Sequence, residues 1–144
     1  MINKSLEVDK SIIINASKSK IWKTLTDPSL IKEYLYGTET ITDWKVGSDL
    51  IFQGDWQGQP YKDKGNIMEI TPEKILSYDY WSGFSGLEDV PENYSLVTYT
   101  IEDEGEMVRL RVKQTGFGSE ENQSHSEAGW TQVLEKIKEI AEAL

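Results

Sequence analysis

The amino-acid sequence predicts an α+β fold in which a curved antiparallel sheet of about seven strands wraps around one long C-terminal helix. Strand-like alternation runs through residues 6–15 and again through most of residues 38–115. Helical spacing is confined to two short segments after the first strand and to the C-terminal segment. Strands that are grouped together and segregated from the helices are typical of α+β folds, not of βαβ units.

The N-terminal segment, residues 6–15, has the period-two pattern of a strand. The apolar residues on its shared face are Leu6, Val8, Ile12 and Ile14. Two short helices are expected next, because Ser17 and Asp27 are good N-caps and Pro28 suits a first helical position. Gly37 is expected to end the second helix, since glycine readily adopts the left-handed conformation found at helix C-termini.

Residues 38–115 carry the remaining strands, separated by turn residues. We expect strands over residues 41–44, 50–56, 61–70, 76–80, 97–101 and 108–114. The facing of the strand over 61–70 stays open, because Ile67, Met68 and Ile70 do not share a parity. Residues 82–93 form one long irregular loop, and long loops in compact domains tend to be functional or mobile.

The C-terminal segment is the strongest helix in the sequence. Ser124 and Glu127 have the spacing of a capping box and are expected to start it. A single apolar stripe then continues for four turns. Its members are Trp130, Val133, Leu134, Ile137, Ile140, Ala141 and Leu144.

Length and composition restrict the classes of function. The 144 residues predict a single domain spanning 1–144, and the absence of cysteine excludes disulfides and thiolate metal sites and fits a cytoplasmic location. A formal net charge of −10 makes binding to nucleic acid unfavourable, because the phosphate backbone is also negative. No signal peptide is expected, and no membrane span, since no window approaches 18 consecutive apolar residues.

Four stretches, in this order along the chain, resemble a known family. They are residues 16–28 (ASKSKIWKTLTDP), 44–47 (WKVG), 65–76 (GNIMEITPEKIL) and 114–138, which opens with QTGF and closes with GWTQVLEKIK. The chain resembles the SRPBCC superfamily, also called START-like or birch-pollen-allergen-like. Within it, the chain is similar to the group related to the C-terminal domain of the activator of the heat-shock-protein-90 chaperone ATPase.

The resemblance implies a helix-grip fold, with a seven-stranded sheet around the last helix and a cavity between them. It also implies a chaperone as an alternative partner. The eukaryotic cochaperone carries an additional N-terminal domain that contacts the chaperone, whereas this sequence begins directly at its first strand. We therefore expect binding of a small molecule more than activation of a chaperone.

The residues favour no particular reaction, and we assign no catalytic residue, metal or cofactor. The single histidine, His125, lies in a polar stretch where no catalytic triad or metal site can be built around it. Gly-rich phosphate loops are absent. Asp63 or Glu69 would face inward if the odd parity of the strand over 61–70 holds, and a carboxylate in an apolar cavity is a candidate acid or base.

The predicted inner faces are rich in tyrosine and tryptophan, whose polar edges need partners when they are buried. The residues expected to line the cavity are Phe52, Trp56, Tyr78, Tyr80, Tyr99, Leu110, Val112, Gln114, Trp130, Leu134 and Ile137. Those expected at its rim are Tyr34, Phe84 and Leu87. Alternatively, the aromatic side chains simply fill a closed core.

Three functions therefore stay open: binding of a small apolar or aromatic molecule, contact with a chaperone, and an enzyme of the polyketide-cyclase or hydrolase type. A cavity of several hundred cubic ångströms favours the first and the third. An exposed apolar patch on the sheet favours the second. A buried carboxylate that touches the cavity distinguishes the third from the first.

Overall fold

The computed structural model describes residues 2–83 and 85–144, apart from the side chain of Trp56, and in this part of the chain seven strands form one antiparallel sheet. Its strands are β1 (Asn3–Ile14), β2 (Glu39–Ile41), β3 (Asp49–Trp56), β4 (Gln59–Thr71), β5 (Ile75–Tyr80), β6 (Ser95–Glu104) and β7 (Met107–Phe117). Their order is β1-β7-β6-β5-β4-β3-β2, so only the pairing of β1 with β7 joins distant parts of the sequence. The predicted α+β helix-grip fold is confirmed.

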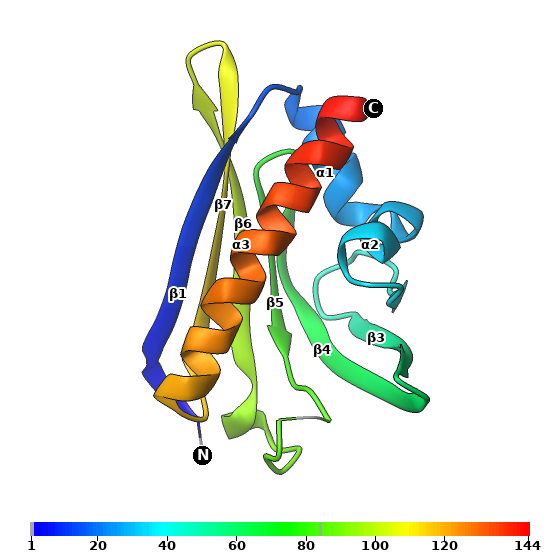
Figure 1. Ribbon diagram of the computed structural model, residues 1–144, viewed down its shortest axis with the longest axis vertical. Helices are drawn as coiled ribbons and strands as arrows, with labels where there is room; N and C mark the ends of the chain where they lie inside the picture. Colours follow the sequence, from blue (N-terminus) through cyan, green and yellow to red (C-terminus); the bar gives the residue numbers. More distant parts are fainter. Residues whose placement is uncertain (1, 84) are drawn as a thin grey trace.

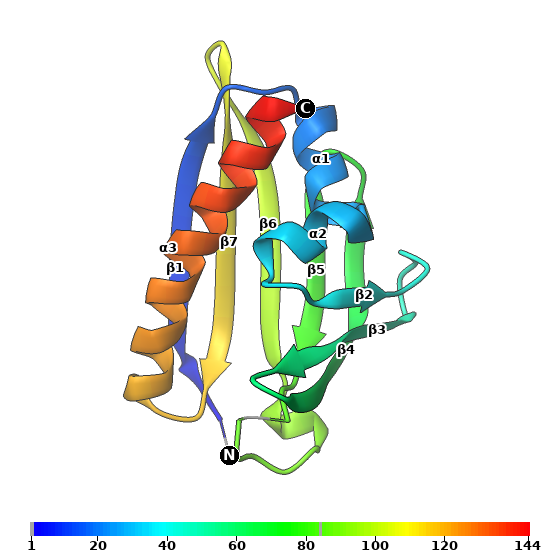
Figure 2. The same ribbon diagram turned by 45° about the vertical axis from the view of Figure 1, so that its right-hand side comes forward.

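Three helices cover the inner face of this curved sheet in the described part of the chain (Figures 1 and 2). They are α1 (Lys18–Thr26), α2 (Pro28–Tyr34) and the long α3 (Glu120–Ala143). A short 3₁₀ turn, Pro91–Asn93, lies before β6. Both views place α1 beside the C-terminal end of α3, and the segment between β5 and β6 at the opposite end of the sheet. Among the described residues, no helix is both long and apolar enough to cross a membrane.

The predicted ends of α1 and α2 are confirmed by their hydrogen bonds. The Ser17 side chain accepts from the backbone N–H of Lys20 at 3.2 Å, and the Asp27 carboxylate accepts from that of Ser29 at 2.9 Å. Gly37 follows α2 with a φ of +88° and donates its N–H back to the Lys32 carbonyl. The left-handed conformation of this glycine therefore turns the chain from α2 toward β2.

Two predicted boundaries are wrong. Helix α3 begins at Glu120, four residues before the expected cap Ser124, and Ser119 caps it by accepting from the backbone N–H of Asn122 at 3.1 Å. Two glutamates in the first turn complement the helix dipole, which makes this earlier start favourable. The strand expected over 41–44 lies instead at Glu39–Ile41, because Trp44 has a φ of +60°, which a strand cannot accommodate.

An irregularity in the pairing of β4 with β5 explains why the apolar residues of β4 do not share one parity. Ile67 pairs with Tyr78 but Glu69 pairs with Ser77, so Met68 is an extra residue at this point of β4. Before the bulge, the odd residues face inward: Asp63 and Ile67 are buried. After it the parity shifts, which leaves Glu69 exposed. The sequence alone showed mixed parity because a β-bulge reverses which positions face the core.

Candidate functional site

A cavity of about 470 Å³ lies between the sheet and the N-terminal half of α3. This volume falls in the range of small-molecule pockets. The residues that line it are Leu35, Tyr36, Thr38, Phe52, Tyr61, Asp63, Tyr78, Tyr80, Ser82, Val97, Gln114, Ser126, Gly129, Trp130 and Val133. Tyr36 is 68% exposed, so the cavity reaches the protein surface beside the segment that follows α2.

Strand register determines which part of the inner face borders the cavity. Tyr78, Val97 and Gln114 are consecutive partners across β5, β6 and β7 and form one row of its wall. The next inward row, Leu76, Tyr99 and Val112, does not line it. This second row lies one step closer to the β4–β5 and β6–β7 turns, and its members belong to the hydrophobic core. Figure 1 shows α1 and the C-terminal part of α3 over that end of the sheet.

The structure separates the residues predicted to line the cavity into two groups. Phe52, Tyr78, Tyr80, Gln114 and Trp130 do line it. The others whose side chains are described belong to the hydrophobic core and do not contact the cavity: Tyr99, Leu110, Val112, Leu134 and Ile137, with exposures of 0–4%. Period-two alternation indicates that a side chain faces inward, but not how far along the strand the covering helix leaves space.

Trp130 stands at the boundary between the cavity and the filled core. Its ring lines the cavity and also packs edge-on against Tyr99, with the ring centroids 5.8 Å apart and the planes at 84°. Behind it, the hydroxyls of Tyr99 and Tyr78 are hydrogen-bonded to each other. Burial raises the pKa of both tyrosines above the usual value, so both hydroxyls stay protonated.

The predicted rim differs from the observed one. Tyr34 is only 4% exposed and belongs to the core, while the two residues after it, Leu35 and Tyr36, line the cavity. Leu87 lies in a neighbouring hollow of about 290 Å³, which shares Tyr80, Ser82, Gln114 and Ser126 with the main cavity. Phe84 and the side chain of Trp56 lie outside the described residues. His125 is exposed on α3 and borders the neighbouring hollow, not the main cavity.

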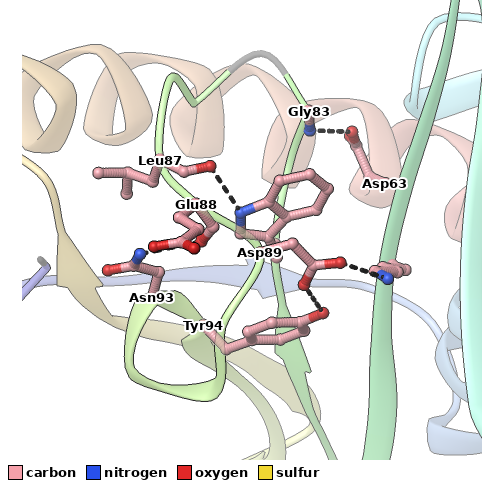
Figure 3. Close-up of polar contacts among 9 residues, drawn as sticks. Asp63, Gly83, Leu87, Glu88, Asp89, Asn93 and Tyr94 are labelled. Atoms are coloured by element: carbon pink, nitrogen blue, oxygen red, sulfur yellow. Dashed lines mark hydrogen bonds and ion pairs between the residues drawn. The ribbon is translucent and has the colours of Figure 1, made fainter.

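The loop after β5, which contributes Ser82 to the cavity, is fastened by polar contacts (Figure 3). The Trp81 indole N–H donates to the Leu87 carbonyl at 3.2 Å. Asp89 accepts from the Tyr94 hydroxyl at 2.6 Å and forms an ion pair with Lys64 of β4. The ion pair ties the loop to β4 beside the cavity, and the other two contacts join parts of the loop to each other.

Gln114 is the centre of one polar group in the cavity wall. Its Oε1 accepts from the Trp130 indole N–H at 2.7 Å and from the Ser126 hydroxyl at 3.0 Å. Its Nε2 donates to the Ser95 hydroxyl at 3.1 Å. Because an indole N–H can only donate, the oxygen of the Gln114 amide must face Trp130, which leaves the second amide N–H of Nε2 free of these contacts.

Asp63 is the second polar point. It is 7% exposed, and its Oδ2 accepts from the Tyr80 hydroxyl at 2.6 Å. Its Oδ1 accepts from the backbone N–H of Gly83 at 3.3 Å (Figure 3). Burial, followed by the negative charge of Asp63, holds the pKa of the Tyr80 hydroxyl well above its usual value. Tyr80 therefore remains a neutral donor toward the carboxylate.

Several lining residues were not predicted to border the cavity. Asp63 was recognised only as a possible inward acid, because the bulge in β4 hid its parity. Tyr61 shares that parity with Asp63 and was missed for the same reason; its hydroxyl is hydrogen-bonded to that of Thr38. Gly129 could have been found from the sequence, because a glycine inside an amphipathic helix often has a packing or functional reason.

Comparisons with known proteins agree with this architecture. A protein from Cytophaga hutchinsonii with a known solution structure is 37% identical, with a TM-score of 0.83 over 99% of this chain and 97% of that one. The Aha1 dimer from Colwellia psychrerythraea shares the fold at 17% identity, with a TM-score of 0.74 over 94% of this chain and 96% of that one.

CalU16 from Micromonospora echinospora also shares the fold, at 18% identity, with a TM-score of 0.73 over 94% of this chain and 75% of that one. No curated protein matches the chain. The model of one protein family, described as Activator of Hsp90 ATPase homolog 1-like protein, matches residues 15–142. That match begins directly after β1 and includes the other six strands and the helices as far as the last turn of α3, and the chain therefore belongs to the Activator of Hsp90 ATPase homolog 1-like family.

Proposed function

We propose that this chain binds a small apolar or aromatic molecule in the cavity between the sheet and α3. The observation that carries the proposal is a cavity of about 470 Å³ walled mainly by aromatic and aliphatic side chains, with a few polar groups among them. Small-molecule sites combine an apolar wall with a small number of placed polar groups in this way. A protein interior without such a role is normally filled by its side chains.

Gly129 provides a direct test. It lines the cavity from α3, and a Cβ atom added there meets no atom within 4 Å. Gly129→Leu therefore adds a side chain to the cavity wall from a Cβ position that is free of contacts. It also removes the helix penalty of glycine, which is about 0.8–1.0 kcal/mol relative to alanine. We expect at least tenfold weaker binding of the neutral fluorophore N-phenyl-1-naphthylamine, together with an unchanged or higher melting temperature.

Ala128→Leu is the matched control, because it places the same side chain one position away on an exposed part of α3. We expect it to bind the fluorophore as the wild type does. Equal binding by the wild type and by Gly129→Leu would show that the fluorophore binds elsewhere and would contradict the proposal. Native mass spectrometry of the purified protein complements the titration, because a co-purified molecule should be retained by the wild type and lost from Gly129→Leu.

An acid–base enzyme of the polyketide-cyclase type is a second candidate, favoured by the buried carboxylate of Asp63 in the cavity wall. A carboxylate placed beside a bound molecule can remove a proton from it. Exchange of the α-protons of 2-tetralone in deuterated water, followed by NMR, tests this activity. Exchange faster than in buffer alone, and lost in Asp63→Asn, supports it; exchange at the buffer rate contradicts it.

Contact with the chaperone Hsp90 is the remaining alternative, and the family to which the chain belongs supports it. Its test is a pull-down with the purified chaperone in the presence and absence of ATP. Failure to recover the chaperone under both conditions would contradict this alternative and leave the cavity proposal untouched.

A further inference from the structure

We propose that Asp63 selects the ligand by charge, so that the cavity prefers apolar molecules carrying an N–H or O–H donor, above all a protonated amine, and rejects carboxylates. The inference rests on the proposed binding function and names the chemical class of its ligand. Two observations support it: the hydrogen bonds around the buried carboxylate of Asp63, and the lack of basic side chains among the described residues of the cavity wall.

Asp63 has the capacity to accept further hydrogen bonds. A carboxylate offers about four acceptor positions on its two oxygens. Tyr80 occupies one position on Oδ2 and the Gly83 N–H occupies one on Oδ1, at 2.6 and 3.3 Å. Each oxygen therefore keeps an acceptor position for a donor group on a bound molecule.

The described part of the cavity wall offers no positive charge to Asp63. None of the described residues that line the cavity is a lysine, arginine or histidine. The neighbours of Asp63 along β4 do not compensate it: Lys62 is exposed, and Lys64 is paired with Asp89 on the loop. Tyr80 stays a neutral donor and supplies no positive charge. A cationic ligand would therefore provide the counter-charge that the wall lacks, which is the arrangement that makes a buried charge least costly.

The polar group around Gln114 lies elsewhere in the cavity wall. Gln114 has both acceptor positions of Oε1 occupied by Trp130 and Ser126, and it retains one N–H as a donor. The two polar points of the cavity thus differ, with acceptors at Asp63 and a donor at Gln114. The net charge of −10 adds a long-range field that attracts cations and repels anions.

A series of naphthalenes of nearly equal shape separates these effects: 1-methylnaphthalene, 1-naphthylmethanol, protonated 1-naphthylmethylamine and 1-naphthoate. Their dissociation constants are measured by calorimetry at pH 7 and low salt. Hydrogen bonds to a charged group are stronger than neutral ones. We therefore expect the amine to bind about 10- to 100-fold more tightly than the naphthoate, with the alcohol between them.

Asp63→Asn keeps the shape and removes the charge, and should weaken amine binding at least tenfold while improving naphthoate binding. Asp55→Asn is the matched control, because Asp55 is an exposed carboxylate on neighbouring β3 and its loss changes the net charge equally. It should change every affinity less than twofold. Tyr80→Phe removes the hydrogen bond to Asp63 but keeps its charge, and should keep the preference for the amine. That result would show that the preference is lost in Asp63→Asn because the charge is removed, and not because the Tyr80–Asp63 contact is disturbed.

Equal affinities for amine and naphthoate in the wild type would overturn the inference while leaving the binding function intact. So would equal effects of Asp63→Asn and Asp55→Asn, because the preference would then come from net charge. If no member of the series binds, including the neutral 1-methylnaphthalene, the proposed binding function fails and the inference falls with it.

Discussion

Tyr99 tests whether the boundary between the cavity and the filled core is correctly located. It is 4% exposed, does not line the cavity, and packs edge-on against Trp130. Truncating a buried aromatic residue to alanine costs about 3–5 kcal/mol, of which the aromatic pair contributes about 0.5–1.5 kcal/mol. For a chain of this length, each kcal/mol lowers the melting temperature by roughly 3–4 °C. Tyr99→Ala should therefore lower it by about 10–20 °C.

Urea denaturation gives the free energy of unfolding, and circular dichroism gives the melting temperature. Tyr99→Phe is the control: it removes only the hydroxyl that is hydrogen-bonded to that of Tyr78, and should cost about 1 kcal/mol. Below its melting temperature, Tyr99→Ala should bind N-phenyl-1-naphthylamine within threefold of the wild type. A loss of less than about 1.5 kcal/mol together with lost binding would refute the reasoning, because Tyr99 would then belong to the cavity wall.

Three further predictions concern the backbone, the helix cap and pH. Gly65→Ala should cost about 3 kcal/mol or more in urea denaturation, because its Cβ would lie 1.8 Å from the backbone oxygen of Asp79. Ser119→Ala should cost about 1 kcal/mol, whereas Ser124→Ala should change stability by less than about 0.5 kcal/mol. A backbone N–H donor and a nearby lysine lower the pKa of Glu142 below 4.5, so its contribution to stability exists above pH 4.5 and is lost as the pH falls through the folded-state pKa. Glu142→Gln should therefore lower the melting temperature at pH 7 and leave it unchanged near pH 2.

Each of these predictions has a control that separates it from a general effect of mutation. Gly83→Ala, where the new Cβ meets nothing within 4 Å, should change the free energy of unfolding by less than about 0.5 kcal/mol. If Ser124→Ala lowered the free energy of unfolding more than Ser119→Ala, Ser124 would be the N-cap of α3, as the capping-box spacing predicts. If Glu142→Gln lowered the melting temperature equally at pH 7 and pH 2, the ionisation of Glu142 would not contribute to stability.

The order of elements and the faces of most strands follow from residues close together in sequence. Alternation over β6 and β7, the caps at Ser17 and Asp27, and the apolar stripe of α3 are local patterns with direct structural counterparts. They predicted an α+β helix-grip fold because each element needs one apolar face buried, and segregated strands and helices satisfy that need in few ways. The inward polar group Gln114 was found from the same alternation.

Tertiary structure alone decided where the space lies. Tyr78 and Tyr99 both face inward, but only Tyr78 borders the cavity, because the packing of α1 and α3 fills one end of the sheet and leaves the other open. The bulge at Met68 decided that Asp63, not Glu69, is the buried carboxylate. Side-chain direction is a local property of a strand, whereas an unfilled volume depends on how separate elements approach one another. The sequence by itself therefore determined the sheet and its helix, and their packing determined the cavity and its single acidic group among the described lining residues.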